Sequence, residues 1–84
     1  MYIEIYLLEQ LDAFARHGTL AAASEELHLT QPTLTRSMQK LESQLGVPLF
    51  ERENKKIGLN ENGRLAADYA ARILSVENEM KHRL

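Results

Sequence analysis

The first half of the chain repeats apolar side chains at helical spacing. Within residues 4–17 these side chains are Ile5, Leu8, Leu11, Phe14 and Ala15. Such spacing is typical of an amphipathic helix that buries one face. Gly18 can end this helix because it accepts left-handed backbone without a Cβ clash, and Thr19 can cap the helix that follows.

A short helix over residues 20–27 is predicted next. Its apolar side is formed by Leu20, Ala23 and Leu27. Residues 28–30 leave room only for a tight turn. Thr30 can then cap a third helix, with Pro32 in the first turn, where its missing N–H costs nothing.

The third helix is predicted over residues 31–45. Its apolar stripe consists of Leu34, Met38, Leu41 and Leu45. The positions that point away from this stripe are Pro32, Arg36, Gln39, Lys40 and Ser43. The helix therefore has one face for a core and one polar outer face, and Gly46 and Pro48 end it.

Two short strands and a long helix complete the pattern. The strands are predicted at residues 49–52 and 56–59, joined by residues 53–55. Asn60 can cap the last helix, which continues to the end of the chain. Its apolar seam is Leu65, Tyr69, Ile73, Val76, Met80 and Leu84. Such a seam either packs against a partner or folds back on its own domain.

These elements predict a mainly α fold: a winged helix-turn-helix of three helices and a two-stranded β wing, followed by a long linker helix. We expect two parts, residues 1–60 and residues 61–84. The chain has no Cys, which excludes disulfides, thiolate metal sites and thiol catalysis. It has no apolar run long enough to span a membrane and no signal pattern. We therefore expect a soluble cytoplasmic domain.

The net charge of −2 at first argues against a nucleic-acid partner, but its distribution matters more. Residues 1–30 carry five acidic side chains against Arg16 alone. Residues 31–56 carry five basic side chains against three acidic ones. The positive charge thus lies in the middle third, which also holds the predicted helix-turn-helix and wing.

A short helix, a tight turn and a helix with a polar outer face form the helix-turn-helix pattern. The major groove of B-DNA admits one α-helix, and the N-terminal end of the second helix contacts base edges. Here that end carries Gln31, Pro32, Thr33, Thr35 and Arg36. Gln can pair with adenine, Arg with guanine, and Thr methyls suit the thymine methyl.

Each of these features also has a plainer interpretation. Gln31 and Thr33 can be ordinary first-turn residues, and Arg36 can be merely solvated. The charges of the wing can serve only to discourage edge pairing. The pattern alone therefore favours DNA binding but does not exclude these plainer interpretations.

A family resemblance decides between these interpretations. It is carried by Leu11, Phe14, Gly18-Thr19, Ala22-Ala23, Leu27, Gln31-Pro32, Leu41-Glu42, Leu45-Gly46, Leu49-Phe50, Arg52, Leu59-Asn60 and Gly63. In sequence and spacing the chain closely resembles the LysR-type transcriptional regulators of bacteria over essentially its whole length. The resemblance implies a sequence-specific DNA-binding domain that binds an inverted-repeat operator as a dimer. The large effector-binding domain of that family is not part of this chain.

The resemblance also implies roles for particular residues. The residues expected at the DNA are Thr19, Gln31, Pro32, Thr33, Thr35, Arg36, Lys40, Arg52, Lys55 and Lys56. The residues expected between two antiparallel linker helices are Leu65, Tyr69, Ile73, Val76 and Met80. The expected partners are double-stranded DNA and a second copy of the chain, with higher oligomers possible in a longer protein. No cofactor, metal, membrane or small-molecule site is expected.

The chain departs from the common family pattern at several positions. Thr33-Leu34-Thr35 stands where the family often has Ala-Val-Ser, and the bulk of Thr33 can alter base preference. Lys55 stands where a wing Arg is common, which replaces a bidentate contact by a point charge. Two rival functions have weaker support in the sequence. An enzyme is disfavoured because the sequence has neither a Gly-rich phosphate-binding loop nor a zinc-binding His motif. The acidic first helix leaves open a winged helix that serves only as a protein-interaction module, but the basic residues after position 35 and the Gln31-Pro32 helix start argue against it.

Overall fold

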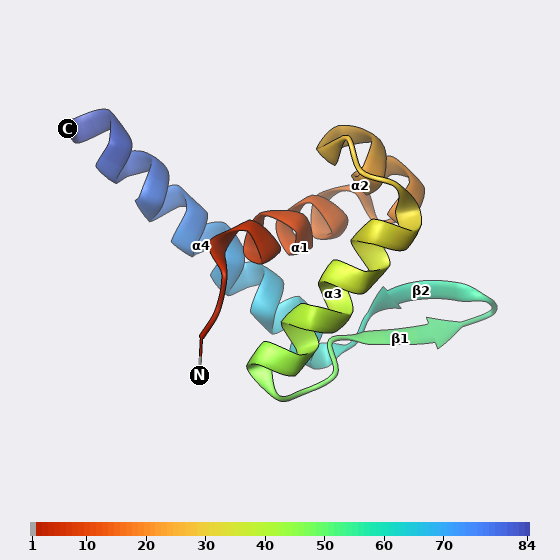
Figure 1. The fold of residues 1–84 in the computed structure, drawn as a ribbon. Helices are drawn as coiled ribbons and strands as arrows, with labels where there is room; N and C mark the ends of the chain where they lie inside the picture. The colour runs from red at the N-terminus through yellow and green to blue at the C-terminus, as the bar shows by residue number, and fades with distance from the viewer. Residues whose placement is uncertain (1) are drawn as a thin grey trace.

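The computed structural model describes residues 2–84. Over that range the helices are α1 (Ile5–His17), α2 (Leu20–Leu27), α3 (Gln31–Leu45) and α4 (Glu61–Arg83), and the strands are β1 (Phe50–Glu53) and β2 (Lys56–Leu59) (Figure 1). The predicted fold class is confirmed: the chain is mainly helical, with a helix-turn-helix, a two-stranded wing and a long final helix. Helices α2 and α3 have the predicted bounds.

The predicted helix ends are also confirmed, because they depend on local chemistry. Gly18 adopts left-handed backbone with φ 80° at the end of α1. The Thr19 hydroxyl accepts a hydrogen bond from the Ala22 N–H at 3.2 Å. Asn60 Oδ1 accepts one from the Gly63 N–H at 2.8 Å, which caps α4. Each cap satisfies a backbone N–H that the helix itself leaves free.

The wing differs slightly from its prediction. Strand β1 begins at Phe50 rather than Leu49 and includes Glu53, which pairs with Lys56 across the antiparallel ladder. The connection is therefore the pair Asn54 and Lys55, with φ 52° and 64°. Two consecutive residues of positive φ match the twist of a two-residue hairpin turn. Leu49 faces Asn60 and accepts its N–H at 2.9 Å, but the ladder ends there because the Leu49 N–H donates to the Glu42 carboxylate at 2.7 Å and the Asn60 carbonyl accepts from the Arg64 N–H at 2.9 Å.

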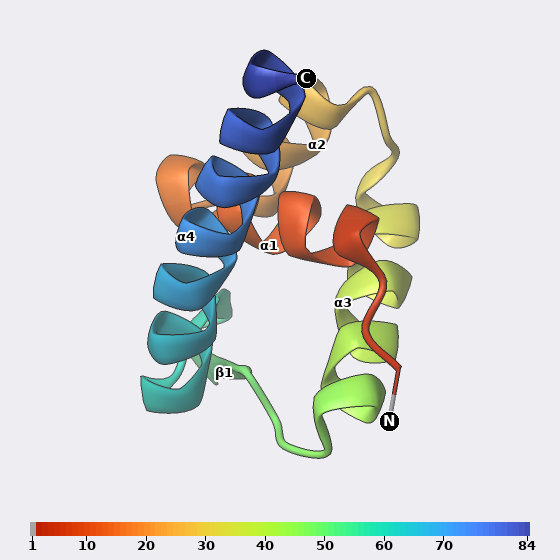
Figure 2. The same ribbon diagram turned by 90° about the vertical axis from the view of Figure 1, so that its left-hand side faces the viewer.

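Helix α1 lies at the centre of the molecule, between α3 and α4 (Figure 2). The largest fully buried side chains are Phe14, Leu7, Leu11, Leu34, Leu41 and Leu49. They come from α1, α3 and the segment before the wing, and the ring of Phe14 meets that of Phe50 edge to face at 5.3 Å. The prediction for α1 was wrong at two positions, since Ile5 and Ala15 are exposed, and it missed the buried Leu7.

Helix α4 has two different sides. Gly63, Ala67 and Ala70 are buried against the rest of the fold. The seam residues Leu65, Tyr69, Ile73, Val76, Met80 and Leu84 are exposed. The seam thus does not fold back on its own domain, and the C-terminal half of α4 projects away from the wing (Figure 1). The first half of α4 packs in the same core as the preceding elements. The division into parts 1–60 and 61–84 stays a prediction.

Candidate nucleic-acid interface

The N-terminal end of α3 is presented to solvent beside α2. Gln31, Pro32 and Arg36 are exposed, and Thr33 and Thr35 are half-buried. A shallow hollow at this end is lined by Leu20, Gln31, Pro32, Thr35 and Arg36. Four of the predicted site residues therefore share one surface. The core face of the same helix, with Leu34 and Leu41 fully buried, fixes which side points outward.

Thr33 lies next to Arg36 at this end of the helix. Arg36 Nη2 donates a hydrogen bond to Thr33 Oγ1 at 3.3 Å. The Thr30 hydroxyl, which caps α3 by accepting from the Thr33 N–H at 3.3 Å, is 2.8 Å from the same oxygen. Thr33 is thus bonded to both the helix cap and the predicted guanine-reading side chain.

The wing extends this surface on one side. Arg52 and Glu51 of β1, together with Thr35 and Gln39 of α3, line a hollow of about 180 Å³. Lys55 and Lys56 are exposed at the turn of the hairpin. In Figure 1 that turn and the N-terminal end of α3 lie on the same side of the molecule, opposite the C-terminal end of α4. The structure therefore brings Arg52 to the α3 surface and places the two lysines at the wing tip.

Lys40 lies farther along α3 and points toward α1. Its Nζ is 2.8 Å from Glu4 Oε1 and donates a hydrogen bond to the Tyr6 hydroxyl at 3.2 Å. Gln44 Nε2 donates to the same Glu4 oxygen at 2.9 Å. The bond to Glu4 raises the pKa of Lys40, and the bond from Lys40 lowers the pKa of Glu4. Among residues 2–84, Lys40 is the one predicted DNA residue that forms an ion pair with an acidic side chain.

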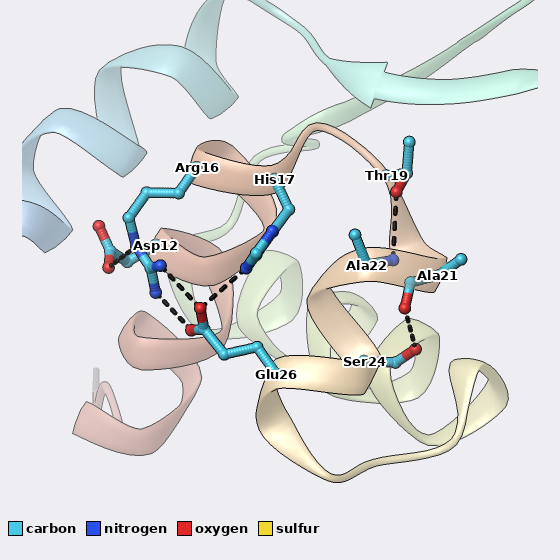
Figure 3. Close-up of polar contacts among 8 residues, drawn as sticks. All are labelled: Asp12, Arg16, His17, Thr19, Ala21, Ala22, Ser24 and Glu26. Carbon is cyan, nitrogen blue, oxygen red and sulfur yellow. Dashed lines mark hydrogen bonds and ion pairs between the residues drawn. The ribbon is translucent and has the colours of Figure 1, made fainter.

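Thr19 caps α2 and directly precedes Leu20, which lines the hollow at the N-terminal end of α3. An ion-pair cluster joins α2 to α1 (Figure 3). Arg16 donates to both carboxylate oxygens of Glu26, at 2.9 and 2.6 Å, and to Asp12 at 3.0 Å. His17 Nε2 is 2.8 Å from Glu26 Oε1. The Arg16 guanidinium lowers the pKa of Glu26 to about 2, with His17 adding to the effect. This cluster links the C-terminal end of α1 to α2, which in turn packs against α3.

Glu42 is the residue that sequence reasoning missed as an organiser of this surface. Its Oε2 accepts hydrogen bonds from the backbone N–H groups of Leu49 and Phe50, at 2.7 and 3.3 Å. The carboxylate of α3 thereby anchors the start of the wing. Glu42 was among the residues that carried the resemblance, but its spacing gave no sign of the backbone groups it binds, which lie seven and eight residues later.

Comparison with known proteins gives the family. The model of the bacterial regulatory helix-turn-helix proteins of the lysR family matches residues 5–64. The chain belongs to the LysR family. A RuBisCO operon transcriptional regulator of Allochromatium vinosum is 37% identical over 81 residues, which are 96% of this chain and 27% of that protein. A probable RuBisCO transcriptional regulator of Gracilaria tenuistipitata var. liui is 42% identical over 72 residues, 86% of this chain and 23% of that protein.

Solved structures of LysR-type proteins have the same fold. The DNA-binding domain of CbnR in complex with DNA is 40% identical, with a TM-score of 0.88 over 96% of this chain and 93% of that one. A BenM DNA-binding domain in complex with its benA site 1 DNA is 28% identical, with a TM-score of 0.88 over 96% and 91%. The chain is thus a LysR-type helix-turn-helix DNA-binding domain, and its relatives are transcriptional regulators rather than enzymes.

The chain spans about a quarter of the length of the curated relatives it matches. Among residues 2–84, no helix has the length and apolar content needed to cross a membrane. Within the same residues, no three His, Cys, Asp or Glu side chains are grouped as metal ligands would be.

Proposed function

We propose that this chain binds an inverted-repeat operator as a homodimer and so directs a LysR-type transcription regulator to its DNA. Helix α3 enters the major groove with its N-terminal end foremost, and the wing contacts the adjacent backbone. Gln31 and Arg36 contact base edges, while Arg52, Lys55 and Lys56 contact phosphates. The observation that carries the proposal is the shared exposed surface of Gln31, Pro32, Thr35 and Arg36 on a fold whose relatives have been solved with DNA.

Thr19 and Lys40 differ from the other predicted DNA contacts in how they would reach a phosphate. Thr19 lies at the N-terminus of α2, where free backbone N–H groups attract phosphate. Lys40 contacts a phosphate only if its ammonium leaves Glu4 or shares its charge with both groups, since Glu4 lies 2.8 Å away. We therefore expect Lys40 to contribute less to DNA affinity than Arg52 or Lys55.

The exposed seam of α4 supports the homodimer. Leu65, Tyr69 and Ile73 line one wall of an apolar groove of about 500 Å³, whose opposite wall includes Ile3, Ile5, Leu45 and Val47. Contiguous apolar surface of this kind marks an interaction site. Antiparallel pairing of two α4 helices would cover Tyr69, Ile73, Val76 and Met80 at once. A dimer also matches the two half-sites of an inverted repeat, because protein symmetry and operator symmetry correspond.

A regulator that joined this domain to an effector-binding domain would have further properties. We expect an effector-binding domain to add subunit contacts, so that higher oligomers form in the intact regulator. A regulator of bacterial DNA acts in the cytoplasm, and we expect this one to do so as well.

The experiment that tests the proposal measures binding of labelled DNA duplexes by fluorescence anisotropy at several salt concentrations, with selection of bound sequences from a random pool. If each subunit neutralises about three phosphates, log affinity falls with log salt at a slope near −5. Selected sequences should contain an inverted repeat. A folded dimer that bound no duplex at low salt would favour the protein-interaction module, and binding without salt dependence would contradict the phosphate contacts.

A further inference from the structure

The hydrogen bonds of Thr33 leave its hydroxyl in a defined state. A hydroxyl oxygen can accept two hydrogen bonds and donate one. Thr33 Oγ1 accepts from Arg36 Nη2 at 3.3 Å and from the Thr30 hydroxyl at 2.8 Å. The Thr30 oxygen in turn accepts the Thr33 N–H at 3.3 Å, so Thr30 both donates to and accepts from Thr33. Both acceptor positions of Thr33 are thus filled, and its proton is left for an outside acceptor.

Thr33 is also the partner that Arg36 has in this structure. Within residues 2–84, the Arg36 side chain forms that one hydrogen bond and no ion pair. The two residues are three positions apart on α3, which puts them on the same face of the helix. Replacement of the Thr33 hydroxyl would therefore leave an exposed, rotamer-rich side chain without an anchor.

A comparison with Arg16 shows why a hydroxyl suits this place. Arg16 is bound by two carboxylates, at 2.6 Å from Glu26 and 3.0 Å from Asp12, so its charge is compensated within the chain. Arg36 is held by a neutral group through one of its five N–H donors. Its charge and four donors remain available, enough for the bidentate contact that an arginine makes with guanine.

We propose that Thr33 is a specificity-determining residue, which acts by holding the Arg36 guanidinium in position for base contact. The proposal rests on the proposed function, in which the N-terminal end of α3 meets base edges. Thr33 lowers the conformational entropy that Arg36 loses on binding, so its contribution appears at the preferred base and not in general phosphate attraction.

The test uses three variants. Thr33→Val keeps the shape and the β-branch but removes the hydroxyl, and Thr33→Ser keeps the hydroxyl but removes the methyl group. Arg36→Ala supplies the background for a double-mutant cycle. The first readout is the NMR order parameter of the Arg36 side-chain N–H in the free protein. The second is the ratio of affinities for the selected operator and a scrambled duplex.

We expect Thr33→Val to lower the Arg36 order parameter and to reduce the affinity ratio by about threefold to tenfold, the gain expected from one pre-ordered side chain. Binding to the scrambled duplex and the salt slope should not change. Thr33→Ser should retain both the order parameter and the ratio. In the Arg36→Ala background, Thr33→Val should have no further effect on specificity.

Three results would overturn the proposal. The Arg36 order parameter could be equal in wild type and Thr33→Val, or specificity could fall as far in the Arg36→Ala background as in wild type. Specificity could also fall in Thr33→Ser but not in Thr33→Val, which would assign the effect to the methyl group. If the wild-type chain bound no duplex, the proposed function and the specificity role would both fail, whereas the NMR comparison would still decide whether Thr33 holds Arg36.

Discussion

Helices α1 and α4 both carry an apolar stripe, but the two stripes have different surroundings. Leu7, Leu11 and Phe14 of α1 are almost completely buried, whereas Tyr69 and Val76 of α4 are 51% and 64% exposed. The buried stripe is accounted for within the chain, since α1 contacts α2, α3 and α4. The stripe of α4 is left exposed by the described part of the chain, although its spacing is as regular as that of the α1 stripe. Helical periodicity therefore predicts that a face will be covered but not by which molecule.

The largest effect is expected in the buried stripe, from Phe14→Ala. Phe14 is 2% exposed and packs against Phe50, and loss of such a ring costs about 3–5 kcal/mol. The free energy of unfolding should fall by that amount at every protein concentration, because the cavity lies within one chain. Urea denaturation followed by circular dichroism at two concentrations measures this. A loss that vanished at high concentration would place Phe14 in an interface instead.

The second effect is expected in the exposed stripe, from Ile73→Asp. A charge in the middle of the proposed dimer contact, present twice in the dimer, should weaken self-association about a hundredfold. The circular dichroism spectrum of the monomer should not change, because Ile73 is not part of the core cluster. Sedimentation equilibrium gives the dissociation constant.

Asn78→Asp is the matched control for Ile73→Asp. It adds the same charge at an exposed position of α4 outside the seam and should leave self-association unchanged. Loss of the monomer fold in Ile73→Asp would contradict the comparison, since the seam would then belong to the core of its own chain.

The third effect is expected from Gly63→Ala, where the buried side of α4 packs against the segment before the wing. A Cβ at Gly63 would overlap the Leu49 carbonyl oxygen, which already accepts the Asn60 N–H. Gly63→Ala should therefore cost about 1–3 kcal/mol of stability, as overpacking does. Gly58→Ala is its control, because a Cβ there meets no atom within 4 Å. Equal melting temperatures of the two variants would show that the start of α4 does not pack as described.

The smallest effect is expected at the surface, from Glu26→Gln. The Arg16 guanidinium holds the folded-state pKa of Glu26 at about 2, below its ordinary value of 4.5. The carboxylate therefore contributes its full stabilisation above about pH 4.5 and loses it as the pH falls toward 2. Because the pair is exposed, the contribution is small. Thermal melts should show Glu26→Gln slightly less stable than wild type at pH 7 and equal to it near pH 2.

Glu25→Gln is the matched control, because it removes a carboxylate of the same helix that has no ion-pair partner among the described residues. Glu25 is also exposed on α2, so Glu25→Gln should leave the free energy of unfolding at pH 7 close to that of wild type. A difference between Glu26→Gln and wild type that stayed constant from pH 7 to 2 would contradict the assigned role of the Arg16 pair.

The fold could be predicted from sequence where local chemistry decides it. Thr19, Thr30 and Asn60 cap their helices as their residue types indicate, and Gly18 and Gly46 end two of them. The start of β1 could not be predicted, because it depends on the Leu49 N–H binding the Glu42 carboxylate instead of the carbonyl of Asn60, the residue opposite Leu49. The predicted core face of α1 was partly wrong for a similar reason: three helices pack around α1, and no single stripe describes its burial.

The candidate site, like the fold, could be predicted from sequence only in part. That Gln31, Pro32, Thr35 and Arg36 share one exposed surface follows from helix geometry, and the structure has them together. The partners of Lys40 and the hydroxyl contacts of Thr33 depend on side-chain positions that spacing does not give. The roles of all these residues at DNA, and of the α4 seam in a dimer, remain predictions.

The most direct test of the account is a footprint of the selected operator with wild type, Arg36→Ala and Ile73→Asp at one salt concentration. Wild type should protect two half-sites related by a two-fold axis. Arg36→Ala should bind with reduced preference for the operator, and Ile73→Asp should need a much higher concentration for protection of both half-sites. Protection of a single half-site by wild type, with the same affinity in Ile73→Asp, would contradict the claim that the exposed stripe of α4 pairs two DNA-binding units.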